Sequence, residues 1–339
     1  MKKCIKYLLD IDLNSFLNNN VFNLILAMKF AITRPCRRRG MITSTGQKLV
    51  EVFLFLERDG SQKMKEGFQR LKKEIDQLSR LLELSKVIQY LKDREKEGGG
   101  FSFAPELYPD LEDTYFAVRI LQFLDVDVDR NNTAKYLKNI NWKEVGFPRA
   151  VYMLLYVHLS LGIELPRQLI DLSVKDWSGF TILDAQYFSD EIRRLLHQPP
   201  SPLPFVSPFR FQGHENLQTL RKKVSILLDR DIDFDREQIV RWVQLSQNGD
   251  GGFGFYPETT SYMENTYCAL EILSMLGSSP VQIELCRKYI LSCQTKNGGF
   301  CRAPASFPFI ESTYHAVTGL LLLNGMEEEK VSSAITMMT

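Results

Sequence analysis

Residues 251–276 read GGFGFYPETTSYMENTYCALEILSML, and this phrase occurs twice more, as GGFSFAPELYPDLEDTYFAVRILQFL at 99–124 and as GGFCRAPASFPFIESTYHAVTGLLLL at 298–323. In each copy a Phe closes the Gly-Gly pair, a Thr follows 13 residues after that Phe, and a Glu lies two residues before the Thr. The three glutamates are Glu112, Glu264 and Glu311. A spacing kept three times indicates a structural unit that the chain repeats.

Each copy predicts an outer helix, a turn, a loop and a buried inner helix. Glycine adopts left-handed backbone angles without a clash, so the Gly-Gly pair is expected to stop the preceding helix. The proline that follows keeps the next residues out of helix. A new helix is expected to begin near Glu-x-Thr-Tyr, where an acid suits the positive end of the helix dipole. Its apolar residues surround the helix axis, which predicts burial on most sides.

The number of units predicts a closed ring. Phe253 and Phe300 are 47 residues apart, which fits a helical hairpin, and the gap from Phe101 to Phe253 holds about three such units. Degenerate copies are expected at 146–147, 178–180 and 211–213. Because one hairpin cannot close its own core, neighbours must stack on it. We therefore predict an all-α protein, an α/α toroid (α-α barrel) of about six helical hairpins over residues 46–330. Residues 1–45 are expected to form a poorly ordered N-terminal appendage.

Composition and charge narrow the possible partners and compartment. The formal net charge is +1, which gives no reason to expect nucleic acid as a partner. The six cysteines form no CxxC pair, which favours reduced thiols and a cytoplasmic protein. The apolar run at 21–32 is too short to span a bilayer, but basic residues follow it, so peripheral membrane contact is an expectation. The proline-rich segment 198–211 cannot be regular helix and is expected to be a linker, a lid or a strap on the ring surface.

At 247–253 and at 294–300 a Gln is followed by Gly-Gly-Phe, and an acid, a Tyr and a predicted buried helix come after it. This pattern resembles the β subunits of protein prenyltransferases. The same repeat is typical of squalene-hopene and other class II terpene cyclases. The resemblance covers roughly residues 80–325. It implies a toroid whose apolar funnel accepts an isoprenoid chain. For a prenyltransferase it also implies a polyprenyl diphosphate substrate and an α-subunit partner.

The first functional hypothesis is a prenyltransferase-like transferase. In that family zinc is held by Asp-x-Cys at the start of one inner helix and by a His at the start of the last. The resemblance assigns Glu264 to the Asp position, Thr266 to the Cys position and His315 to the His position. Zinc is therefore the expected cofactor, with Glu264 and His315 as ligands, although Thr replaces a thiolate. Arg302 is the basic residue expected near the diphosphate of the substrate.

The second hypothesis is a class II terpene cyclase. Residues 108–114 read YPDLEDT, which is similar to the Tyr-Pro-Asp-x-Asp-Asp-Thr stretch of squalene-hopene cyclases. Asp110, Glu112 and Asp113 would then be catalytic, because crowded carboxyls repel and one can stay protonated and donate that proton. The aromatic faces of the substrate-binding residues would stabilise a cationic intermediate. These residues are Tyr115, Tyr267 and Tyr314.

The third hypothesis is a non-catalytic isoprenoid-binding or scaffold protein. All three repeats carry Glu at the same position, so these glutamates can also be first-turn helix residues without chemistry. The missing Cys at position 266 agrees with a site that has lost its reaction. The sequence leaves these three alternatives open.

Overall fold

The computed structural model describes residues 83–142, 144–177, 179–203 and 205–338, and for 327–338 it describes the course of the helix alone. The described residues all belong to one compact unit that begins at Gln77. The expected appendage at 1–45, its basic-flanked apolar run and the expected domain start at 46 lie outside the described residues.

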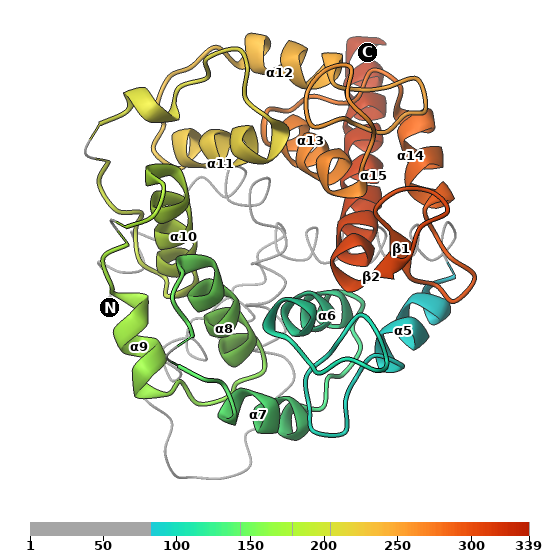
Figure 1. The fold of residues 1–339 in the computed structure, drawn as a ribbon. Coiled ribbons are helices and arrows are strands. Elements are labelled where there is room, and N and C mark those ends of the chain that lie inside the picture. The colour runs from blue at the N-terminus through green and yellow to red at the C-terminus, as the bar shows by residue number, and fades with distance from the viewer. Residues whose placement is uncertain (1–82, 143, 178, 204, 339) are drawn as a thin grey trace, which may run out of the picture. The chain divides into compact units, whose positions relative to one another are not determined.

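Within the described ranges, six helices form an inner ring and five lie outside it (Figure 1). The inner helices are α6 (Leu111–Phe123), α8 (Pro148–Ser160), α10 (Ile182–Leu195), α11 (Leu217–Leu228), α13 (Met263–Met275) and α15 (Ile310–Met338). The outer helices are α5 (Leu84–Lys92), α7 (Arg130–Lys138), α9 (Arg167–Ser173), α12 (Arg236–Leu245) and α14 (Ile283–Ser292). Each inner helix packs on the next, and α15 packs on α6, so the ring closes. This arrangement confirms the predicted α/α toroid.

The degenerate copies of the repeat are confirmed as entries to inner helices. Residues 146–147 precede α8, residues 179–180 precede α10, and residues 211–213 precede α11. The described residues between α10 and α11, which are 196–203 and 205–216, form no outer α-helix. In its place the proline-rich segment carries only the short 3₁₀ helix η1 (Ser207–Phe209).

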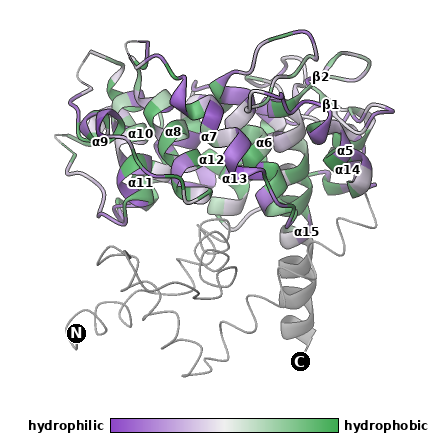
Figure 2. Cartoon of the chain, turned by 90° about the horizontal axis from the view of Figure 1, so that it is seen from below, coloured by the Kyte–Doolittle hydropathy of each residue, from purple (hydrophilic) through white to green (hydrophobic). Residues whose placement is uncertain are grey.

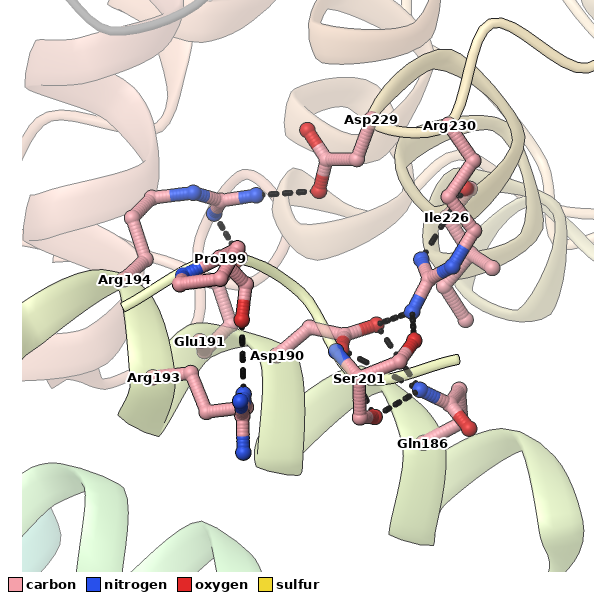
Figure 3. A network of polar contacts seen from close by, with 10 residues as sticks. All are labelled: Gln186, Asp190, Glu191, Arg193, Arg194, Pro199, Ser201, Ile226, Asp229 and Arg230. Carbon is pink, nitrogen blue, oxygen red and sulfur yellow. Dashed lines mark hydrogen bonds and ion pairs between the residues drawn. The ribbon is translucent and has the colours of Figure 1, made fainter. Parts of the chain in front are cut away.

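The proline-rich segment packs on the ring as a strap, held by polar contacts at Pro199 and Ser201 (Figure 3). Asp190 of α10 accepts from the Ser201 backbone N–H at 3.1 Å, and Arg230 donates to the Ser201 carbonyl at 2.7 Å. Arg230 also pairs with Asp190 at 2.7 Å. Further along the strap, Phe209 is fully buried against Tyr187, Ile226 and Leu227. The strap therefore covers the outer side of this corner as a helix does elsewhere.

The 13-residue spacing between Phe and Thr has a direct structural cause. The Thr266 hydroxyl accepts the Phe253 backbone N–H at 3.0 Å and donates to the Tyr262 carbonyl at 2.9 Å. The same two bonds recur at Thr114 and Thr313. Because the hydroxyl satisfies buried backbone groups at both ends of the loop, it fixes where the Phe and the inner helix meet. All three phenylalanines are fully buried.

The Gly-Gly pair does not stop the preceding helix, contrary to the sequence prediction. Helix α12 ends at Leu245, well before Gly251. The pair instead allows close contact with the next outer helix, since a Cβ on Gly251 would lie 2.2 Å from the Leu285 carbonyl. In the last copy, Gly298 approaches the Lys86 carbonyl of α5 in the same way. The last repeat therefore packs on α5, the first helix of the described residues.

The final inner helix begins at a short hairpin. Strands β1 (Phe300–Cys301) and β2 (Pro308–Phe309) pair antiparallel, and α15 follows directly. Figure 2 shows this hairpin at one edge of the helical layer, near the start of α15. The helix runs to Met338, beyond the predicted end of the toroid at 330. The residues after Gly325 include good helix formers such as Glu, Lys, Ala and Met.

Candidate functional site

The three repeat glutamates lie in one charge cluster with Arg149 and Arg302 where the inner helices begin, and we call this cluster the mouth. Arg149 of α8 is ion-paired with Glu112 of α6 and lies 3.6 Å from Glu311 of α15. Because α6 lies between α8 and α15, the Arg149–Glu311 contact joins two inner helices that both pack on α6. Arg302, on the hairpin before α15, lies 4.0 Å from Glu264 of α13. Four inner helices and one loop thus supply this cluster.

Glu311 has the most perturbed acidity at the mouth. Burial raises the pKa of its carboxyl to about 7, and the neighbouring charges of Glu112 and Glu264 act in the same direction. Arg149 and Arg302 oppose this rise in pKa. A carboxyl with a pKa near 7 is partly protonated at neutral pH. The net charge of the mouth therefore changes by one in this pH range.

The acidic motif predicted for cyclase chemistry does not gather at the mouth. Glu112 faces Arg149, whereas Asp110 caps α6 by accepting the Asp113 backbone N–H at 2.8 Å. Asp113 accepts the Phe103 backbone N–H of the preceding loop at 2.7 Å. Burial raises the pKa of Asp113 to about 8, and the adjacent Asp110 carboxylate adds to the rise. The carboxyl with the raised pKa therefore faces the loop and the capping Asp110.

The raised pKa of Asp113 gives a stability prediction for Asp113→Asn. The unfolded Asp ionises near pH 3.9, whereas folded Asp113 keeps its proton up to about pH 8. Between these values the folded state holds more protons, so wild-type stability should fall as pH rises. Asn resembles the protonated acid, so Asp113→Asn should match the wild type near pH 4 and be more stable at pH 9. Urea denaturation between pH 4 and pH 9 tests this prediction. If the unfolding free energy changes with pH equally in the two proteins, the raised pKa of Asp113 is wrong.

The predicted substrate-binding tyrosines lie on neighbouring inner helices one turn below the glutamates. The Tyr267 and Tyr314 ring centroids are 5.8 Å apart, and Tyr115 contacts Tyr156 of α8 at 5.2 Å. The guanidinium of Arg119 lies over Tyr115, Tyr156 and Tyr314 at 4.7–5.3 Å. The lining described here is therefore aromatic and charged, and differs from the apolar funnel that the resemblance implied.

The residues present do not fit a zinc centre. The Thr266 hydroxyl is used by backbone groups at both ends of its loop. His315 stacks on Tyr267 with ring centroids 4.6 Å apart, and Glu264 faces Arg302. Throughout the described part of the chain, no group of three or more His, Cys, Asp or Glu side chains could hold a metal ion. We derive no step that involves a metal.

Sequence reasoning missed the arginines of the ring interior. Arg149 follows the degenerate entry Gly146-Phe147 by two residues, so it occupies the first turn of its inner helix as the glutamates do. Arg119 lies seven residues after Glu112, on the same helix face. The repeat register could have found both residues, because positions equivalent to the glutamates share their direction. Without that alignment to the repeat, the presence of an arginine at 119 or 149 does not indicate that its side chain lies inside the ring.

A comparison with known families gives a match to the prenyltransferase alpha-alpha toroid domain over residues 66–154 and 213–338, more than half of the chain. The chain belongs to this family. Within it, the toroid is 28% identical over 128 residues to the geranylgeranyl transferase type-1 subunit beta of Arabidopsis thaliana. That match covers 38% of this chain and 32% of the relative, so the toroid matches about a third of the relative's length.

Among solved structures, the prenyltransferase toroid is similar to Candida albicans protein geranylgeranyltransferase-I complexed with GGPP. The sequence identity is 13% and the TM-score is 0.31, with 63% of this chain and 84% of that chain covered. This likeness is too weak to support an argument about geometry or ligands. No helix within the described ranges is long and apolar enough to cross a membrane.

Proposed function

We propose that this toroid binds an isoprenoid ligand, whose anionic head lies at the mouth, without zinc-dependent transfer. The observation that carries the proposal is the pair of arginines, Arg149 and Arg302, at the end of the ring where the inner helices begin. Helix N-termini and guanidinium groups both favour phosphate oxygens. The name of the Arabidopsis relative, a geranylgeranyl transferase subunit, supports a prenyl ligand class.

The third hypothesis from the sequence is therefore favoured over the other two. A transferase would need a metal-bound thiolate, and the donor set around Glu264 does not fit zinc. A cyclase would need an acid beside the ligand, whereas Asp113 accepts a hydrogen bond from the Phe103 backbone N–H of the preceding loop. A cyclase would also develop positive charge among tyrosine faces that Arg119 already covers.

Titration calorimetry with geranyl, farnesyl and geranylgeranyl diphosphate tests the proposal. Arg149→Gln should weaken binding at least about tenfold, because a charge-assisted bond to the head is lost. Arg241→Gln removes an exposed guanidinium on α12 and should leave affinity unchanged. If the wild type binds none of the three diphosphates, the proposed function is wrong.

Glu311 should make this binding depend on pH. Its pKa is raised to about 7, so below pH 7 it is protonated and the mouth holds one negative charge less. Affinity for the anionic head should then be roughly three- to tenfold higher at pH 6 than at pH 8. Glu311→Gln should bind with little pH dependence beyond that of the diphosphate itself. Titration of both proteins at the two pH values measures this, and parallel profiles would argue against a role for Glu311.

We further propose an α-subunit-like protein partner at the rim of the mouth. Tyr108 is 93% exposed and Phe307 is 82% exposed, each on a loop that leads into an inner helix. Exposed aromatic side chains are typical anchors of protein interfaces. We expect a protein partner to copurify with the wild type, and the double variant Tyr108→Ser, Phe307→Ser should keep prenyl binding but lose that partner; a wild type that purifies alone would also contradict the interface. Equal retention of that protein would contradict this interface.

A further inference from the structure

The interior of the ring carries a second charged layer below the mouth. Arg119 lies seven residues after Glu112 on α6, and Glu271 lies seven residues after Glu264 on α13. Residues seven apart share one face of a helix, and two turns separate them by about 10 Å. Since Glu112 and Glu264 belong to the mouth, Arg119 and Glu271 lie deeper on the same interior faces.

Contacts to neighbouring helices support this placement for Arg119. Its guanidinium lies 5.2 Å from the ring centroid of Tyr156 on α8 and 4.7 Å from that of Tyr314 on α15. These are the two inner helices on either side of α6. Arg119 lies on the same face of α6 as Glu112 and contacts both α8 and α15. Its side chain therefore lies along the inner wall of the ring.

The opposite part of the wall carries an ion pair at the same depth. Arg221 of α11 lies 3.0 Å from Glu271 of α13 and donates to the Tyr187 hydroxyl of α10 at 3.2 Å. The pair thus spans three consecutive inner helices. Burial lowers the pKa of His315 well below its usual value, and Arg221, Arg149 and Arg119 are further causes, which agrees with cations on several sides of this histidine.

We propose that Arg119 and the Arg221–Glu271 pair form a charged floor that limits the ring to prenyl ligands of geranyl length or shorter. The inference rests on the proposed function and names its substrate class. An apolar chain longer than the distance from mouth to floor must lie against charged groups to which it can make no hydrogen bond, which is unfavourable. In an apolar funnel each added isoprene unit would tighten binding, because more apolar area is buried. A charged floor about two helix turns below the mouth, or about 10 Å, removes the gain in affinity for the part of a chain that would extend beyond it.

The test compares dimethylallyl, geranyl, farnesyl and geranylgeranyl diphosphate by titration calorimetry on the full chain. The wild type should bind geranyl diphosphate about tenfold more tightly than the farnesyl compound. Arg119→Leu should reduce this ratio to about two or less by tightening farnesyl binding, whereas Arg119→Lys should keep the wild-type ratio. Glu112→Gln is the control at the mouth, and it should change all affinities by a similar factor.

A second variant keeps the test valid if Arg119→Leu does not fold. Replacing the ion pair together, Arg221→Met with Glu271→Leu, removes the other half of the floor without leaving one charge unpaired. It should also favour longer chains. Equal or tighter binding of farnesyl than geranyl diphosphate by the wild type overturns the floor alone. Absence of binding by all four compounds overturns the floor and the proposed function together.

Discussion

Gly251→Ala is expected to lower the free energy of unfolding by about 3 kcal/mol or more, which for a chain of this length corresponds to a fall in Tm of at least roughly 4–6 °C. Gly251 has φ of +91°, and a Cβ there would lie 2.2 Å from the carbonyl carbon and oxygen of Leu285. Two backbones would have to separate, because neither atom belongs to a flexible side chain. Calorimetry or urea denaturation of the full chain measures the loss.

Gly249→Ala is the matched control for this prediction. Gly249 lies in the same loop, two residues earlier, and a Cβ there meets no atom within 4 Å. Its effect should stay within about 0.5 kcal/mol. Similar losses for the two variants would show that the loop tolerates no side chain in general, and that the contact with Leu285 is not the cause.

Asp190→Ala is the second large effect, with an expected loss of about 3–5 kcal/mol. Asp190 and Arg230 are nearly buried and pair at 2.7 Å, and Asp190 also accepts the Ser201 N–H of the strap. Truncation leaves the guanidinium without its carboxylate and releases one attachment of the strap. The Tm of the variant reports the loss, and limited proteolysis should cut the strap near Ser201 sooner than in the wild type.

A double replacement separates the charge from the packing. Asp190→Leu with Arg230→Met removes both partners, so no buried charge remains unpaired, and part of the lost stability should return. The comparison with each single variant gives the coupling between the two side chains. A double variant as unstable as the sum of the singles would mean that the pair is not coupled.

Much of the fold could be predicted because the fixed spacing within the repeat follows from contacts that each copy makes. The Phe–Thr interval reflects two hydrogen bonds of one hydroxyl, so Thr266 and its equivalents mark each loop wherever the copy is intact. The degenerate entries to α8, α10 and α11 also fell at the expected places. The role of Gly251 was misread, because a glycine needed for a close backbone contact looks in sequence like one that ends a helix.

For the candidate site, too, some features follow from the sequence and others only from the tertiary structure. The sequence by itself determined the ring, its inner and outer layers and the common direction of Glu112, Glu264 and Glu311, because these follow from periodicity and local backbone chemistry. Only the tertiary structure decided that Arg149 lies within 3.6 Å of Glu311, that Asp113 faces a loop, and that Arg221 pairs with Glu271. The reason is physical: a pKa near 7 at Glu311 and a charged floor depend on distances between helices far apart in the chain, which local spacing does not encode.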